Sequence, residues 1–467
     1  MSAAAWTARD SREAGSRRRG DAEALALHSL LAAAPTASDL RITITHLRRT
    51  ALLTLLVLSV ATGCSAPSRD TVVRFWAMGR EGEVVAGLLP GFERTHPGVR
   101  VVVQQLPWTA AHEKLLTAFA GESLPDVFQL GNTWIPEFVA LNALEPLDAY
   151  AGTSRDVDLA DYFGGILETN RIGSTLYGVP WYVDTRLLFY RRDLVAQAGF
   201  SDAPRSWPEW MDVLTAVKKT VGANRYAILL PLNEFEPLLA LALQQSAPLL
   251  RDGNRFGNFE SADFRRTLSF YVEIFRRGLA PPLTNADISN VWNEFGRGYF
   301  SFYISGPWNI GEFERRLPPE VRGAWMTAPL PGPDGPGASI AGGSSFVMSS
   351  ASRHKALAWQ LIEYLSQPEM QRALYAATGD LPPRRSAWRD SKLAGDPYAR
   401  AFRDQLERVK PTPKVPEWER IATEMRLAAE RAVHGDWSID RAAAELDARA
   451  DRILDKRRYL IARGATR

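Results

Sequence analysis

The chain has 467 residues, of which 46% are hydrophobic and 23% are charged, with 14 Trp and a single Cys. This length exceeds what one hydrophobic core usually supports, so we expect two or three domains' worth of packed structure and exclude a largely disordered chain. The formal net charge of +3 lies before Cys64, because residues 1–63 hold eight Lys and Arg against five acids. The rest of the chain is formally neutral, which argues against a nucleic-acid binder, since such proteins gather positive charge on one face.

The N-terminal residues 1–63 are predicted to be a leader. An apolar run, Ala51–Ala61, follows Arg48 and Arg49 and precedes Thr62-Gly63-Cys64. The run is shorter than the ~20 residues that a membrane-spanning helix needs, but it suits the apolar region of a signal peptide. We therefore expect removal of the leader and an extracytoplasmic location.

Small residues directly before a cysteine resemble the bacterial lipobox, in which the cysteine becomes the lipidated N-terminus. Ala61 stands where that motif usually carries Leu. We expect lipidation of Cys64, with residues 64–69 as the linker to the folded body. The alternative is an ordinary secretory signal with a bystander cysteine. With one Cys there is no intrachain disulfide, so the core alone must hold the fold.

The body begins with alternating strands and helices. Residues 71–76 are predicted as a strand, residues 84–92 show helical spacing of apolar side chains, and residues 99–103 alternate as a second strand. A helix with Leu115, Leu116 and Phe119 on one face follows, and then a strand over residues 125–130. Such alternation predicts a parallel sheet covered by helices on both faces, with ligands at the carboxyl ends of its strands. Three polar or aromatic residues stand at such an end, namely Asn132, Thr133 and Trp134.

Helices dominate the rest of the chain. A segment dense in Pro and Gly, residues 329–337, is predicted as a loop. The last 50 residues, rich in Ala, Glu and Arg, are predicted to form two helices. The other predicted helices lie at about 209–220, 236–246, 262–277, 353–366 and 368–377.

The segment Trp181–Leu187 places an aromatic ring, an acid and a base on one side of the chain. If it is extended, Tyr182, Asp184 and Arg186 share one face. This combination suits a sugar, which offers apolar C–H faces to aromatic rings and hydroxyls to charged hydrogen-bonding groups. The alternative is a salt bridge on a solvated strand, worth about 0–1 kcal/mol.

Eight short stretches follow one another along the chain. They are FERTHPGV (92–99), LPDVFQL (124–130), LEPLD (144–148), YGVPWYVDTRLLFYRRDL (177–194), WPEW (207–210), GPW (306–308), APLP (328–331) and AGGSSFV (341–347). Together, in this order over roughly residues 70–460, they resemble the extracellular solute-binding proteins of carbohydrate ABC importers, particularly the maltose/trehalose-binding group.

The resemblance implies an α/β, two-lobed periplasmic-binding-protein fold with three interlobe crossings. These crossings are expected near Tyr182–Thr185, Ala324–Ala328 and Leu381–Arg385. The N-terminal lobe then comprises residues 70–183 plus 326–382. The C-terminal lobe comprises residues 184–325 plus 383–460.

The resemblance also implies a set of sugar-contacting residues, to which the strand-end Trp134 and the shared-face Arg186 are added. At Gly343 and Ser344 this chain has small residues where close family members carry a large aromatic, which suggests a roomier or differently shaped subsite. Glu81 has an alternative role, stabilising a helix start through the helix dipole. The residues implied by the resemblance are Glu81, Asn132, Tyr182, Asp184, Trp308, Gly343, Ser344 and Arg384.

We therefore predict a monomeric binding protein, not an enzyme, that captures a disaccharide such as maltose or trehalose and delivers it to ABC permease subunits. No cofactor or metal is expected, because the sequence lacks His/Cys clusters and nucleotide-binding or nucleophile motifs. One alternative is a glycoside hydrolase that uses two of Asp126, Asp184 and Glu81 as its paired carboxylates. The other keeps the fold but binds a peptide, a polyamine or a metal ion.

Overall fold

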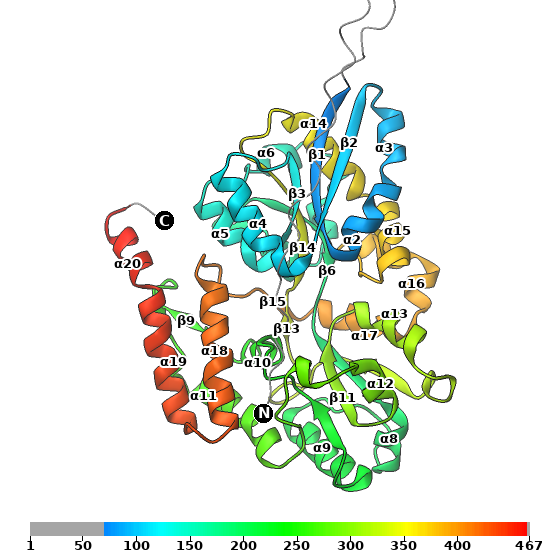
Figure 1. The fold of residues 1–467 in the computed structure, drawn as a ribbon, viewed down its shortest axis with the longest axis vertical. Helices are drawn as coiled ribbons and strands as arrows, with labels where there is room; N and C mark the ends of the chain where they lie inside the picture. Colours follow the sequence, from blue (N-terminus) through cyan, green and yellow to red (C-terminus); the bar gives the residue numbers. More distant parts are fainter. Residues whose placement is uncertain (1–69, 465–467) are drawn as a thin grey trace, which may run out of the picture. The chain divides into compact units, whose positions relative to one another are not determined.

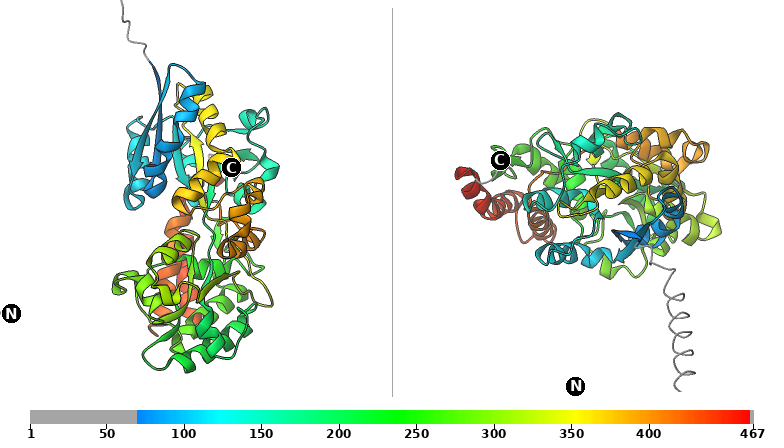
Figure 2. Two further views of the ribbon diagram at one scale, coloured as in Figure 1. Left: turned by 90° about the vertical axis from the view of Figure 1, so that its right-hand side faces the viewer. Right: turned by 90° about the horizontal axis from the view of Figure 1, so that it is seen from above.

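The computed structural model describes residues 70–464. The predicted leader, the linker and the proposed lipid acceptor Cys64 lie outside these residues. Within the described part, two β-sheets, each covered by helices, form two lobes joined by connecting segments (Figures 1 and 2). We call the five-stranded sheet with its helices lobe 1, and the four-stranded sheet with its helices lobe 2.

The sheet of lobe 1 has the strand order β2-β1-β3-β14-β6. Strand β1 pairs in parallel with both β2 and β3, and β14 pairs antiparallel with β3 and β6. The predicted βαβ start is confirmed, although β1 and β2 both run further than expected. The strands are β1 (Thr71–Met78), β2 (Val99–Leu106), β3 (Val127–Gly131), β6 (Gly178–Val183) and β14 (Gly343–Met348).

Helices cover both faces of this sheet, and their apolar sides fill two clusters of buried side chains. The helices are α2 (Gly79–Val84), α3 (Pro90–Thr95), α4 (Trp108–Ala120), α5 (Ile135–Ala140), α6 (Asp148–Ala151), α7 (Gly164–Glu168), α14 (Lys355–Leu365) and α15 (Pro368–Thr378).

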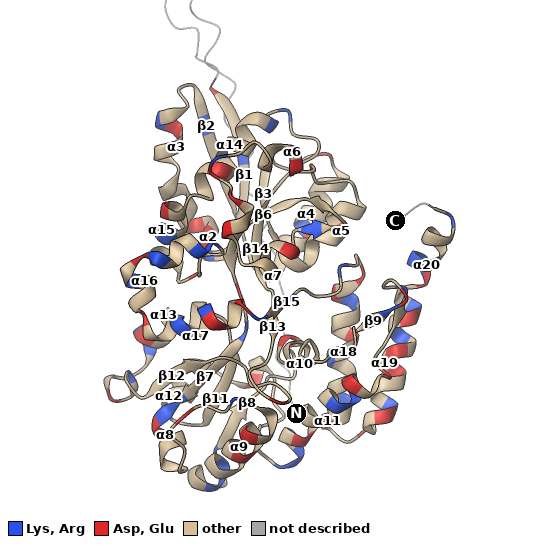
Figure 3. Ribbon diagram, turned by 180° about the vertical axis from the view of Figure 1, so that it is seen from behind, with Lys and Arg blue, Asp and Glu red and all other residues tan. Residues whose placement is uncertain are grey.

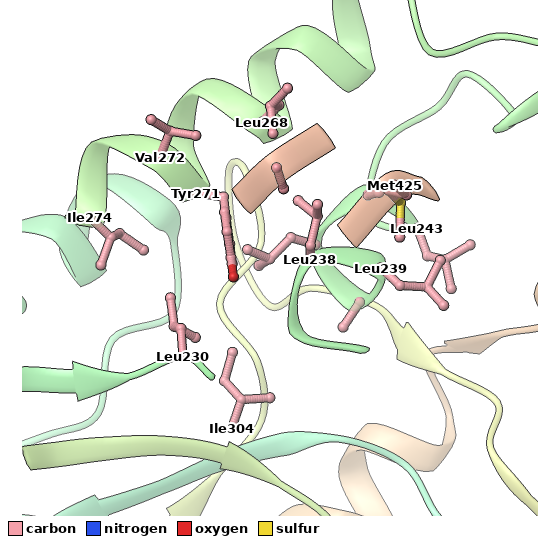
Figure 4. Close-up of a cluster of buried hydrophobic side chains, with 14 of the residues drawn as sticks. Leu230, Leu238, Leu239, Leu243, Leu268, Tyr271, Val272, Ile274, Ile304 and Met425 are labelled. Carbon is pink, nitrogen blue, oxygen red and sulfur yellow. The ribbon is translucent and has the colours of Figure 1, made fainter. Parts of the chain in front are cut away.

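The sheet of lobe 2 has the order β12-β7-β11-β8, in which only the β11–β8 pair is parallel. In its core, leucines of α10 (Glu236–Ala242) pack with Tyr271 of α11 (Ala262–Arg276), Met425 of α18 (Trp418–Val433) and Ile304 of β11 (Phe300–Ser305) (Figure 4). Among them Leu239 also lines the cavity described below, so the core fixes one cavity wall. The strands are β7 (Leu187–Arg191), β8 (Tyr226–Leu229), β11 (Phe300–Ser305) and β12 (Trp325–Ala328).

The C-terminal residues form three helices, α18, α19 and α20, where two were predicted. Helices α18 and α19 pack against α11 of lobe 2, and α20 contacts α19. Figure 3 shows acidic and basic residues interspersed along α18 and α19. None of the helices within residues 70–464 is long and apolar enough to cross a membrane. The helices of lobe 2 and the third crossing are α8 (Arg192–Gln197), α9 (Trp207–Val221), α10 (Glu236–Ala242), α11 (Ala262–Arg276), α12 (Val291–Gly296), α13 (Trp308–Arg316), α16 (Ser391–Gly395), α17 (Pro397–Leu406), α18 (Trp418–Val433), α19 (Ile439–Ile453) and α20 (Asp455–Ala462).

Short strand pairs complete the fold. One of them, β13 with β15, lies between the two large sheets in Figure 1. The pairs are β4 (Arg171–Ile172) with β5 (Thr175–Leu176), β9 (Leu250–Arg251) with β10 (Phe256–Gly257), and β13 (Ser339–Ile340) with β15 (Val409–Lys410).

The sheet memberships locate the passages between the lobes. The chain leaves β6 of lobe 1 and enters β7 of lobe 2 through residues 184–186. The predicted return at Ala324–Ala328, and with it the lobe boundary at residue 326, is wrong. Residues 325–328 form β12, which pairs with β7 in lobe 2, so the return to β14 runs through residues 329–342. The third crossing, near Leu381–Arg385, stays a prediction.

Candidate ligand-binding site

A cavity of about 590 Å³ lies between the two lobes. Its volume falls in the range of small-molecule sites, and its walls mix aromatic rings with carboxylates, which is the surface expected for a polar ligand with apolar faces. Nine of the ten predicted contact residues line it: Glu81, Asn132, Trp134, Tyr182, Asp184, Arg186, Trp308, Gly343 and Ser344.

The lobe 1 wall is built where three parallel strands end. Because β1, β2 and β3 run in the same direction, their carboxyl ends meet at one edge of the sheet. Glu81 follows β1, Trp108 follows β2, and Asn132 and Trp134 follow β3, and all four side chains line the cavity. The sheet topology therefore brings together residues as far apart in the sequence as Glu81 and Trp134.

Glu81 is buried in a polar cluster at this edge. Its carboxylate accepts hydrogen bonds from the Tyr182 hydroxyl and the Trp108 indole, and burial outweighs them so that the pKa of Glu81 is raised. Gln129 supports the cluster, because its side-chain amide donates to the hydroxyl oxygens of Tyr182 and Ser344, each at 3.2 Å. Glu81, for which stabilisation of a helix start was the alternative role, is thus part of the cavity wall.

The side-chain amide of Asn132 has a hydrogen-bond donor without a partner in the described part of the chain. Its Oδ1 accepts a hydrogen bond from Ser345 at 2.9 Å, whereas its Nδ2 has no partner within the described part of the chain, although the residue is only 5% exposed. Buried donors without a partner are rare in folded proteins and call for an explanation. Since Asn132 lines the cavity, a ligand oxygen would satisfy this donor.

Residues of the first crossing between the lobes form another wall of the cavity. Tyr182, Asp184 and Arg186 all line the cavity, which confirms that they share one side of the chain. Arg186 forms an ion pair with Asp184 and contacts Glu236 at 3.4 Å. Burial and the nearby Glu236 raise the pKa of Asp184, while Arg186 opposes that rise. The salt bridge considered as an alternative therefore exists, but it lies inside the cavity.

Trp308 begins α13 and forms part of the lobe 2 wall. The Arg186 guanidinium lies over its ring, 4.6 Å from the centroid. A side chain at Gly306 would place its Cβ 1.8 Å from the indole, so only glycine lets the ring occupy this position. The Gly-Pro-Trp sequence thus fixes the ring between a charged group and the backbone.

Gly343 and Ser344 are small because the lobe 1 sheet is closely packed here. Gly343 has a φ of 128°, and a Cβ at this position would lie 2.2 Å from the Tyr182 carbonyl oxygen. Ser344 is fully buried between Gln129 and the β6 strand. Sheet packing therefore accounts for both residues, and the roomier subsite stays a prediction.

Arg384 does not line the cavity, so its predicted position in the site is wrong. Its guanidinium is buried, and it donates to Asp161 and to the Asp156 carbonyl at 2.7 Å and to the Ser366 carbonyl at 2.9 Å. These bonds tie the start of the predicted third crossing to lobe 1. Motif position alone could not reveal that this arginine has a structural role.

The prediction from sequence missed several cavity residues. Trp108 had a usable signal, because it directly follows a strand that runs parallel to the strand before Asn132. Three acids were also missed. Asp380 follows the end of α15, whereas Glu236 and Glu419 lie in the first turns of helices of lobe 2. An acid in the first turn of a helix is usually a solvated residue that stabilises the helix start. Nothing local in the sequence distinguishes these three acids from others on the surface.

Asp380 is buried, and no lysine, arginine or histidine within residues 70–464 forms an ion pair with its carboxyl group. Burial and then the charge of Glu81 raise its pKa to about 8, while a hydrogen bond with Thr378 opposes the rise. A carboxyl whose pKa rises on folding stabilises the fold fully below its unfolded pKa of about 3.9, and this contribution is lost as the pH rises towards 8.

Asp380→Asn is therefore expected to be more stable than the unmodified protein at pH 8–9, by on the order of 2–4 kcal/mol. Near pH 4 the two proteins should be alike, because the native carboxyl is then protonated. Urea unfolding at pH 4, 6 and 9 checks this. Parallel stability profiles for the two proteins would contradict it.

Comparisons with known proteins bear on this architecture. Residues 79–372 match the family of bacterial extracellular solute-binding proteins. The sugar-binding protein MalE from the phytopathogen Xanthomonas citri is 58% identical, with a TM-score of 0.82 over 84% of this chain and 99% of that one. The GacH receptor of Streptomyces glaucescens shares the fold at 23% identity, with a TM-score of 0.71 over 83% of this chain and 99% of that one.

The chain is also similar in sequence to the diacetylchitobiose-binding protein DasA of Streptomyces coelicolor. It is 24% identical over 343 residues, which cover 72% of this chain and 78% of that protein. These comparisons confirm the predicted resemblance and the two-lobed α/β fold. Because this family binds solutes and does not transform them, the hydrolase alternative is set aside. The chain belongs to the family of bacterial extracellular solute-binding proteins.

Proposed function

We propose that this chain is the substrate-binding protein of an ABC sugar importer and that it captures an α-linked glucose disaccharide, maltose or trehalose, between its lobes. The observation that carries the proposal is the convergence of Trp308 and Trp134 with Asp184, Glu81 and Asn132 on one cavity. Tryptophan faces suit the C–H faces of a pyranose, and carboxylates accept its hydroxyl protons. The 58% identity to a sugar-binding MalE supports the same ligand class.

Binding is proposed to close the lobes on the sugar. Each lobe supplies part of the wall, so a ligand makes its full set of contacts only when both lobes meet it. The ligand can shift the open–closed equilibrium only by its gain in affinity for the closed form. The closed, monomeric protein would then dock on permease subunits in the membrane.

Titration of the purified protein with a panel of sugars tests the proposal. Tryptophans line the cavity, so their fluorescence should change saturably with maltose or trehalose. Saturation with N,N′-diacetylchitobiose alone would keep the sugar class and replace the disaccharide. If no sugar gives saturation while a peptide or a polyamine does, the ligand class is wrong.

We also propose that lipid on Cys64 tethers the protein outside the cytoplasm. The support is the lipobox-like sequence Thr62-Gly63-Cys64 behind an apolar run, together with the extracellular character of the family. After expression in a bacterium, the intact mass should correspond to a chain that begins at Cys64 and carries acyl groups. A chain cleaved nearby without acyl groups would favour the ordinary secretory signal.

A further inference from the structure

We propose that Trp108 is a further specificity-determining residue, which forms an aromatic wall of the cavity in lobe 1 and contacts a pyranose ring of the bound sugar. This inference rests on the proposed sugar-binding function. It adds a residue that does not belong to the set implied by the family resemblance. Trp108 stands at the first position of α4, and only Pro107 separates it from the carboxyl end of β2.

The exposure of Trp108 sets it apart from the other tryptophans that the structure describes. It is 38% exposed, and it is the sole tryptophan among the large hydrophobic residues that are exposed in residues 70–464. Leaving an indole in water forgoes part of the roughly 1.5–3 kcal/mol that burial of a large apolar side chain provides. Because the exposed ring lines the cavity, a ligand is what would cover it.

The indole is nevertheless held in a defined position. Gly79 has a φ of 49°, and a Cβ at this residue would lie 2.7 Å from Cδ1 and Nε1 of Trp108. The indole N–H donates to the Glu81 carboxylate, and the ring meets Trp134 edge-on, with centroids 5.9 Å apart. A ring fixed in this way loses little conformational entropy when a ligand packs against it.

The neighbours of Trp108 define the kind of ligand group that fits. An apolar ring stands beside the carboxylate of Glu81, so the wall offers an apolar surface next to a strong hydrogen-bond acceptor. A pyranose presents the matching pair, a patch of C–H groups with hydroxyls at its rim. Trp308 lines the same cavity from lobe 2, so both lobes would bring a tryptophan to the sugar when they close.

Isothermal titration of Trp108 variants tests the inference, with whichever of maltose, trehalose and N,N′-diacetylchitobiose binds the unmodified protein most tightly. Trp108→Ala is expected to raise the Kd about 10- to 100-fold, and Trp108→Phe less than about 5-fold because an aromatic face remains. The matched control is Trp437→Ala, which removes a tryptophan outside the cavity and should leave the Kd unchanged. Each variant's melting temperature shows that it is folded.

A second variant disturbs the ring without removing it. Gly79→Ala would push the indole from its position, and we expect it to weaken binding as well, whereas Gly87→Ala, with open space around the new methyl group, should not. If the unmodified protein binds a sugar and Trp108→Ala binds it equally well, the inference is overturned and the proposed function stands. If no sugar binds the unmodified protein, the proposed function fails and the inference falls with it.

Discussion

Arg384→Met is expected to lower the free energy of unfolding by about 3–5 kcal/mol, the cost of removing one partner from a buried ion pair. The pair joins Arg384 to Asp161, whose side chains are 8% and 13% exposed. The substitution would also leave the carbonyl oxygens of Asp156 and Ser366 without this donor. Urea unfolding measures the loss directly.

The neighbouring arginine is a matched control for this prediction. Arg385 forms an ion pair with Glu407, but their side chains are 38% and 45% exposed. Arg385→Met should therefore cost no more than about 1 kcal/mol. Equal effects of the two substitutions would contradict the structural role of Arg384, and a stable Arg384→Met protein with weakened sugar binding would restore it to the site.

The pH dependence of stability gives a second readout of the same pair. Burial acts to raise the pKa of Asp161, but hydrogen bonds from Ser386 and Arg384 outweigh it, so that pKa is lowered. A carboxyl of this kind stabilises the fold above its unfolded pKa of about 3.9 and loses that contribution as the pH falls through its folded pKa. The deficit of Arg384→Met should therefore shrink below about pH 4.

Asp184→Ala is expected to raise the Kd for the sugar about 100-fold or more, because it removes a charged acceptor from the cavity wall. Its stability should change little. Arg186 keeps Glu236 at 3.4 Å as a partner, so the substitution does not leave an unpaired buried cation. Isothermal titration and urea unfolding of the same preparation separate the two effects.

Asp193→Ala is the matched control for Asp184→Ala. Asp193 pairs with an arginine two residues away, Arg191, as Asp184 does with Arg186, but it lies outside the cavity. Asp193→Ala should therefore leave the Kd for the sugar unchanged. A large loss of stability in Asp184→Ala without a change in Kd would show that the Asp184–Arg186 pair holds the crossing and does not contact the sugar.

Local patterns in the sequence predicted the features that depend on local structure. Apolar periodicity placed the first strands and helices of lobe 1, and alternation along Trp181–Leu187 placed Tyr182, Asp184 and Arg186 on one side, because successive residues of an extended chain point in opposite directions. The family-like stretches added Glu81, Asn132 and Trp308, which also line the cavity.

The predictions were wrong or incomplete for residues whose position depends on contacts between segments that are distant in the sequence. The family resemblance placed a passage at residues 324–328, yet the pairing of residues 325–328 with β7 keeps them in lobe 2. Arg384 was assigned by motif position, but its partner Asp161 lies 223 positions away. Trp108 and Asp380 join the site only once the parallel strands and the end of α15 meet at one cavity.

The central claim is that the cavity between the lobes is the sugar site. A crystal structure of the protein with its tightest-binding disaccharide tests it most directly. We predict density for the sugar between the lobes, against Trp308, with hydroxyls hydrogen-bonded to Asp184 and to Nδ2 of Asn132. Sugar bound elsewhere on the protein, with these side chains uncontacted, would contradict the claim.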